Sequence, residues 1–206
     1  FTLTATAVIN LKSKVTLEGQ GHGTLITKGD SGHAVSVVGA PGTEIVNWAV
    51  KNLRVVGPSV NTTRKSGCGI FADFAVKGLI EGVDISGFGS SSGDGSVHIR
   101  RCKDVIVTGG SRLHDSLNGF ITSESTAPSA PEAERVTISD SYCYNNWADG
   151  IHGQHSARLN IINNHCYDNS ESGIDLLGDY SDIVVGNDAY SNGGRGIEVG
   201  NTTSSH

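Results

Sequence analysis

The C-terminal part of the chain repeats itself with a strict period. Three segments align without gaps: RVTISDSYCYNNWADGIHG, RLNIINNHCYDNSESGIDL and DIVVGNDAYSNGGRGIEV, the last of which begins one position further into the pattern. Gly150, Gly173 and Gly196 recur at one constant interval, and so do the isoleucines that follow them. Self-similarity with a period of roughly 20 to 50 residues is typical of a solenoid.

The blocks within each period are short and rich in β-branched residues. VTIS, LNII and IVVG are each followed by clusters of asparagine, serine or glycine. Such blocks are typical of strands, and such clusters are typical of turns. The 28 glycines of the chain further disfavour helices. Each period therefore predicts two or three strands that form one coil, with equivalent residues of successive coils stacked about 4.8 Å apart.

Stacked rows follow from this register. The isoleucines after the repeating glycines should form an apolar interior, and Asn146, Asn169 and Asn192 should form a ladder of side-chain amides. Four cysteines lack the CxxC spacing of zinc sites, so we expect buried free thiols and leave their redox state open. These cysteines are Cys68, Cys102, Cys143 and Cys166.

The pattern continues towards the N-terminus with looser spacing. The interval from Gly119 to Gly150 is longer than the one from Gly150 to Gly173, and the surplus fits an inserted loop at 124–134. We therefore expect an all-β, parallel β-helix solenoid that occupies 1–206 as one domain, with about 23 residues per coil in its C-terminal half. The chain starts without methionine on a strand-like FTLTATAVINL, so we expect a fragment of a longer, capped protein.

Alternation along the strand after each repeating glycine assigns the outward side chains. If the isoleucines point into the core, the residues that follow them point out. The outward residues form a polar strip roughly 20 Å long, at about 4.8 Å per coil. Its members are His98, Arg100, Ser123, His152, Gln154, Asp175 and Glu198. Such a strip is either a solvated surface or a ligand-binding face.

Two motifs resemble a known superfamily. INLKSKVTLEGQGHGTLI resembles the first coils of the pectate-lyase-like right-handed parallel β-helix proteins, and NNWADGI and DNSESGI resemble their turns. The resemblance covers most of the chain. It implies a right-handed parallel β-helix with a polysaccharide lying along the outward strip. Fold alone does not fix the reaction.

One chemistry open to the strip is proton abstraction beside a uronate carboxyl, the step shared by lyases and C5-epimerases. His152 is a plausible base, because an unperturbed imidazole titrates at about pH 6.5. Asp175 in the next coil would orient that imidazole. Arg100 or Gln154 would hold the carboxylate of the substrate, and Tyr180 or Tyr144 would act as the acid.

The strand also resembles that of the mannuronan C5-epimerases, which reads Y-G-F-D-P-H and is followed by D-G-F-x-x-D one coil later. Here the matching strands are D-G-I-H-G-Q-H and S-G-I-D-L-L. The chain departs from that pattern at two positions: His152 stands where the family has an aspartate, and Asp149 stands where it has a tyrosine.

Glycoside hydrolysis is the second chemistry. Asp175 and Glu198 lie one coil apart, so their carboxyl groups would be about 5 Å apart, near the separation of retaining enzymes. Each carboxylate has a structural alternative, a salt bridge to a neighbour such as Arg195.

Charge and hydropathy limit the partners. A net charge of −6 argues against nucleic acid or an anionic membrane, and no apolar run is long enough to span a bilayer. We expect a polysaccharide partner and an extracellular or virion-surface location. A secreted lyase or epimerase would be a monomer, and a phage tailspike or adhesin that binds or hydrolyses a surface polysaccharide would be a homotrimer. A purely structural solenoid is the third alternative.

No cofactor or metal is expected. His152 and His155 have a spacing that suits a helix face rather than a strand. The turn GDYSD at 178–182 leaves calcium as an alternative. His114 and His155 are expected in exposed turns.

Overall fold

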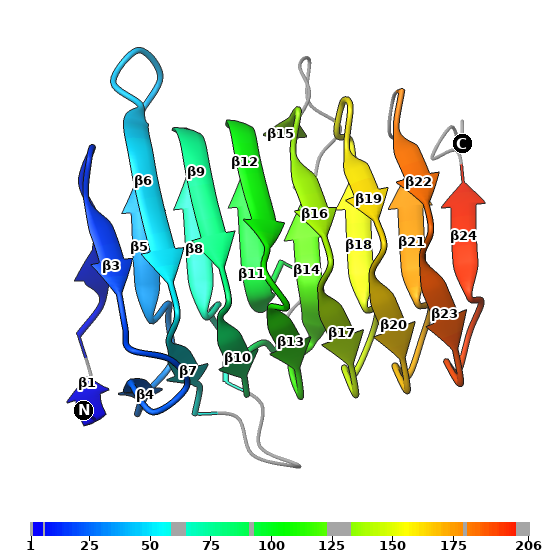
Figure 1. Ribbon diagram of the computed structural model, residues 1–206, viewed down its shortest axis with the longest axis horizontal. Helices are drawn as coiled ribbons and strands as arrows, with labels where there is room; N and C mark the ends of the chain where they lie inside the picture. Colours follow the sequence, from blue (N-terminus) through cyan, green and yellow to red (C-terminus); the bar gives the residue numbers. More distant parts are fainter. Residues whose placement is uncertain are drawn as a thin grey trace.

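The computed structural model describes residues 2–5, 7–58, 65–90, 93–122, 133–178 and 181–200. The described chain winds into a solenoid whose strands form three parallel sheets along one axis (Figure 1). Most coils contribute one strand to each sheet. None of the described residues forms a helix, and accordingly none forms a helix that could cross a membrane.

Sheet A consists of eight strands in spatial order: β1 (Thr2–Ala5), β4 (Leu25–Lys28), β7 (Arg54–Val56), β10 (Asp84–Ser86), β13 (Arg112–His114), β17 (Tyr142–Tyr144), β20 (His165–Tyr167) and β23 (Asp188–Tyr190). Sheet B also has eight: β2 (Ile9–Asn10), β5 (Val35–Val38), β8 (Ile70–Asp73), β11 (Gly95–Arg100), β14 (Asn118–Thr122), β18 (Ile151–Gln154), β21 (Ile174–Leu177) and β24 (Ile197–Gly200).

Sheet C follows the order β3 (Thr16–Glu18), β6 (Ile45–Lys51), β9 (Ala75–Glu81), β12 (Cys102–Thr108), β16 (Thr137–Ser139), β19 (Asn160–Ile162) and β22 (Ile183–Val185). A short strand, β15 (Ala133–Glu134), pairs with β12. These are the last two residues of the insertion expected at 124–134, and the rest of that insertion lies outside the described residues.

The strand register confirms the constant period in the C-terminal half. Ile151 pairs with Ile174, which pairs with Ile197. Phe120 pairs with Ile151, so the coil that contains the insertion is longer than the coils after it, as expected. Earlier coils are also irregular. Ile70 pairs with Val97 on one side and with Val35 on the other, so these two coils differ in length from each other and from the C-terminal ones.

The core is a single apolar column inside the three sheets. Its row on sheet B is completely buried in every coil from Val35 to Ile174. Ile197 continues this row in the last described coil, yet it is 45% exposed because no described strand lies beyond β24. All four cysteines are buried and free, as expected, and Cys143 stacks on Cys166 in the core.

A ladder of asparagine side chains connects equivalent turns of successive coils. The Asn146 side-chain amide donates a hydrogen bond to Oδ1 of Asn169 at 2.9 Å, and Asn169 donates to Asn192 at 2.9 Å. Each amide also donates to a main-chain carbonyl, such as that of Cys143 for Asn169. Buried main-chain groups are thereby satisfied where the strands end. The expected amide ladder is confirmed.

The glycine that opens each repeating strand is required by close approach between coils. A Cβ atom added at Gly150 would lie 2.6 Å from the carbonyl oxygen of Gly173, and one at Gly173 would lie 2.6 Å from that of Gly196. Such distances are well inside van der Waals contact. The repeated Gly-Ile pair therefore encodes both the tight stacking of the coils and the buried column beside it.

Candidate functional site

Strand register places four of the predicted outward residues, His98, His152, Asp175 and Glu198, in one row on sheet B. His98 pairs with Ile121, Ile121 with His152, His152 with Asp175, and Asp175 with Glu198. Side chains of a strand alternate between its two faces, so this row lies opposite the buried isoleucines. The three residues predicted as catalytic therefore occupy successive coils, as the sequence indicated.

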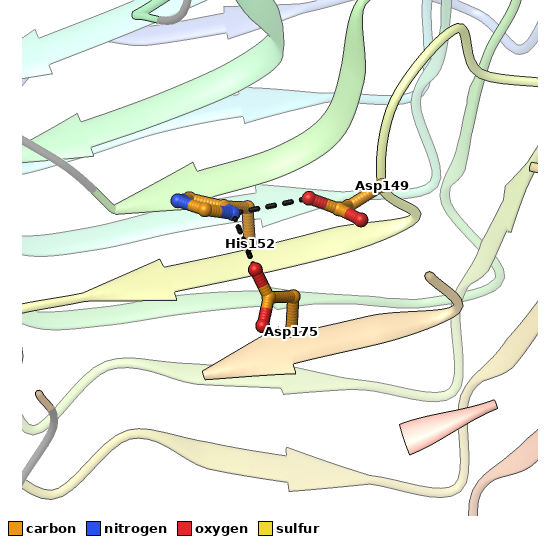
Figure 2. Close-up of side chains that lie close together, drawn as sticks. All are labelled: Asp149, His152 and Asp175. Atoms are coloured by element: carbon orange, nitrogen blue, oxygen red, sulfur yellow. Dashed lines mark hydrogen bonds and ion pairs between the residues drawn. The ribbon is translucent and has the colours of Figure 1, made fainter. Parts of the chain in front are cut away.

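A compact cluster forms where β18 begins. His152 lies between Asp149, in the turn that precedes its own strand, and Asp175 on the next coil (Figure 2). Its Nδ1 atom is 3.1 Å from Oδ2 of Asp149 and 3.4 Å from Oδ2 of Asp175. The two carboxylates therefore share one ring nitrogen and orient the imidazole. Nε2 points away from both carboxylates, and no described residue makes a hydrogen bond to it.

Asp149 is fixed by the coils on either side of it. Its main-chain amide donates to Oδ1 of Asn118 at 3.2 Å, and its Oδ1 accepts a hydrogen bond from the amide of Ser172 at 2.8 Å. Asp149 is buried, and these two hydrogen bonds hold it with Oδ2 directed at His152.

The surroundings of His152 favour its charged form. Burial opposes protonation, because the side chain is only 18% exposed, but the hydrogen bonds and negative charges of Asp149 and Asp175 outweigh burial and raise the pKa of His152 to about 9. At neutral pH the imidazole is therefore protonated and can donate a proton from Nε2. It can act as a base only after losing its proton, which becomes favourable as the pH approaches 9.

The same cluster is the one set of metal-ligating side chains found among the described residues. One ligand atom from each of Asp149, His152 and Asp175 lies within 4.8 Å of the others. The histidine atom that faces the carboxylates is Nδ1, so a cation there would have to displace the proton that they share. The expectation of no metal or cofactor remains a prediction.

Glu198 is in register with Asp175 but has its own partner. Arg195, on the turn before β24, donates to its Oε1. Asp175 faces His152 instead. The two carboxylates thus contact different cations, which is the salt-bridge alternative foreseen for Glu198.

Towards the N-terminus the outward row is buried, so it is not an exposed polar strip along its whole length. Ile121 is completely buried although it lies on the outward side, and His98 is 5% exposed. The His98 ring meets the edge of Phe71 with centroids 5.3 Å apart. Arg100 is half-buried: it donates to Asp73 at 2.6 Å and lies over the ring of Phe71.

Other predicted residues divide into three groups. Gln154 lies on β18, two positions after His152, and is partly exposed. Ser123 and Tyr180 lie outside the described residues, as does part of the turn at 178–182. Tyr144 belongs to β17 of sheet A, where its ring stacks between those of His114 and Tyr167, so it does not lie beside His152.

His114 is not in an exposed turn, and that expectation is wrong. It lies in β13, is buried, and bridges Asp84 and Asp115 through its two ring nitrogens at 3.2 Å and 2.6 Å. His155 lies in a bend after β18 and is partly buried.

A family comparison agrees with this architecture. The family model described as "Right handed beta helix region" matches residues 69–206, about two thirds of the chain. The chain belongs to the right-handed β-helix family. This membership confirms both the predicted fold class and its handedness. A search of curated protein sequences gave no significant match.

Solved structures share the β-helix fold at low sequence identity. The Azotobacter vinelandii mannuronan C-5 epimerase AlgE6 A-module matches 97% of this chain with 19% identity and a TM-score of 0.58. Pectate lyase Pel9A matches 84% with 16% identity and a TM-score of 0.52. The Dettilon tailspike protein gp208 matches 86% with 17% identity and a TM-score of 0.51. The chain spans 64%, 46% and 41% of these three chains, respectively.

Asp149 is the site residue of this β-helix that sequence reasoning did not assign. It was noted only as a departure from a family motif. Alternation within a strand relates His152 to its equivalents on other coils, but Asp149 precedes the strand. The sequence signal was the D-G-I-H string itself. An aspartate in the turn before a strand can direct its side chain towards the residue three positions later, here His152.

Proposed function

We propose that this β-helix protein acts on an acidic polysaccharide by moving the proton beside a uronate carboxyl, as a lyase or a C5-epimerase. His152 is the proposed acid–base group, and Asp149 and Asp175 are its positioning residues. The observation that carries the proposal is the imidazole held at Nδ1 by two carboxylates, with Nε2 left for a ligand. Histidines oriented in this way are typical of general acid–base catalysis.

Elimination and epimerisation begin with the same step. Nε2 of neutral His152 takes the proton from C5 of the sugar. In a lyase the electron pair then forms the C4–C5 double bond while the bond from C4 to the glycosidic oxygen breaks, and that oxygen takes a proton. In an epimerase a proton returns to C5 from the opposite face. Both reactions need a second proton donor and a group that neutralises the uronate carboxylate.

The charge of the cluster defines what the rest of the site must supply. With His152 protonated, two aspartates and one imidazolium carry a net charge of −1. The negatively charged carboxylate of a uronate therefore needs hydrogen-bond donors outside this cluster. Gln154 and Arg100 remain our proposed ligands for it, because both lie on the outward side of sheet B. Ser123 and Tyr180 stay proposed substrate contacts on sequence grounds.

The pKa of His152 gives the proposal a specific pH dependence. If neutral His152 is the base, the rate should rise about tenfold per pH unit below its pKa of about 9 and level off above it. If His152 acts as the acid, the rate should instead fall as the pH passes that value.

The test is turnover of a panel of acidic and neutral polysaccharides. Three readouts apply: absorbance of an unsaturated product, new reducing ends, and exchange of the C5 proton with solvent. On an acidic polymer we expect either an unsaturated product or exchange of the C5 proton. His152→Gln should abolish this signal, and Asp149→Asn should strongly reduce it. His165→Gln, on sheet A, is the matched control and should retain activity. Activity that survives His152→Gln refutes the assignment.

A tailspike or adhesin that binds or hydrolyses a surface polysaccharide is the second candidate. The observation that favours it is the register of Asp175 and Glu198 on adjacent coils, which suits a carboxylate pair. New reducing ends without unsaturation, lost in Glu198→Gln, would support it. This function also predicts a homotrimer in solution and a virion-surface location, whereas a secreted enzyme predicts a monomer.

A further inference from the structure

One corner of the solenoid repeats an uncommon backbone conformation in seven successive coils. The residues concerned have φ between 55° and 62°, which non-glycine residues rarely adopt. They are Lys14, Asn47, Lys77, Asp104, Arg135, Arg158 and Ser181. The pairing of sheet C places them one above another along the axis. We call this row the corner ladder. Four of its seven members are cationic and one is anionic, in a chain of net charge −6.

A groove of about 550 Å³ runs beside the C-terminal half of the corner ladder. Its floor is the outer face of sheet C, formed by in-register residues of β12, β16, β19 and β22, the front layer in Figure 1. The floor residues are Ile106, Thr137, Asn160 and Ile183. The groove therefore extends along the solenoid axis across four coils.

The floor combines apolar and polar groups. Ile106 and Ile183, at its two ends, are 45% and 53% exposed. Between them, the Asn160 amide donates to the Thr137 hydroxyl at 3.2 Å. An extended sugar chain presents the same combination, since a pyranose ring has apolar C–H faces and polar hydroxyl edges.

Arginines form one wall of the groove. Arg135 donates to both carboxylate oxygens of Asp104, at 2.6 Å and 3.0 Å, so its guanidinium is fixed. Arg158 is 57% exposed, and among the described residues it makes one ion pair, from Nη2 to Glu134. A guanidinium has five N–H donors, so most of those on Arg158 remain available for a carboxylate.

We infer that this groove binds an acidic oligosaccharide chain lying along the solenoid axis, with Arg158 contacting a sugar carboxylate. It is a second saccharide site, on sheet C, separate from the Asp149–His152–Asp175 cluster on sheet B. The choice of an acidic sugar rests on the proposed function. A single-stranded nucleic acid fits less well, because none of the described residues that line the groove is aromatic and could stack on a base. Two sites on one rigid solenoid would retain a long polymer by multivalency.

The test is binding of a defined acidic oligosaccharide, an oligogalacturonate or oligomannuronate, to the full chain. Calorimetry in the His152→Gln background keeps the probe intact and makes the measurement independent of turnover. Arg158→Gln should weaken binding at the groove about tenfold. Ile183→Asp, which places a negative charge in the floor, should abolish it.

Lys103→Gln is the matched control. Lys103 contacts the same Glu134, at 3.0 Å, and its replacement removes the same charge, but Lys103 does not line the groove. Because an exposed ion pair contributes little free energy, Lys103→Gln should leave the affinity for the oligosaccharide within about twofold of that of the parent. Circular dichroism confirms that each variant is folded.

Three results would overturn the inference: no binding by the parent, equal weakening by Arg158→Gln and Lys103→Gln, or equal affinity for single-stranded DNA of matched length. The proposed function is judged separately. Turnover by wild type with no effect of Arg158→Gln on binding would refute the groove alone. Binding that Arg158→Gln weakens, without any turnover by wild type, would refute proton abstraction alone.

Discussion

Replacing His152 with glutamine should remove a large part of the dependence of stability on alkaline pH. The fold raises the pKa of His152 from 6.5 to about 9, because Asp149 and Asp175 outweigh the cost of burial. A shift of this size corresponds to roughly 3 kcal/mol of coupling between protonation and folding. Since the folded pKa is the higher one, this stabilisation is complete below pH 6.5 and is lost as the pH rises towards and through 9.

Urea unfolding followed by far-ultraviolet circular dichroism measures the effect. Wild type should lose roughly 3 kcal/mol of unfolding free energy more than His152→Gln between pH 6.5 and a pH above 9. An NMR titration of the ring should report the raised pKa directly. His165→Gln controls for the loss of a histidine, since its imidazole is more exposed and contacts one carboxylate. Equal pH slopes for wild type and His152→Gln would refute the coupling.

Three further changes test the solenoid and the buried His114. Asn169→Ala should reduce the free energy of unfolding by about 2 to 5 kcal/mol in the same urea assay, because the main-chain and side-chain amides of Asn146 both lose their acceptor. Gly173→Ala should lower the melting temperature, since its Cβ would lie 2.6 Å from the Gly196 oxygen, and an unchanged value would contradict the close-approach explanation. Burial opposes protonation of His114, yet Asp84 and Asp115 raise its pKa, so Asp84→Asn should lower the pKa that an NMR titration measures.

The repeat carries enough information to predict the fold and the register of the outward row. A strict period leaves one alignment in which glycines meet the neighbouring carbonyls and isoleucines share a core, so Ile151, Ile174 and Ile197 stack as expected. The same alignment also places His152 beside Asp175, as the strand register has them.

The remaining features depend on interactions that a period does not encode. Asp149 reaches His152 through the path of a turn, and alternation describes strands only. Ile121 and His98 face outward and are nevertheless buried, since alternation gives the direction of a side chain and not what covers it. His114 is buried because Asp84 and Asp115, contributed by different parts of the sequence, satisfy both of its ring nitrogens.

Because the last three coils share one register, a whole coil can be deleted from the chain or duplicated in it as a unit. Deleting residues 150–172 would join Asp149 directly to Gly173 and seat Ile174 on Phe120, so the apolar column and the asparagine ladder would close again without His152. Duplicating the segment 149–171 would instead add a second D-G-I-H layer above the first. Chain length and surface chemistry can therefore change together in single, whole-coil steps while the packing of the interior is preserved.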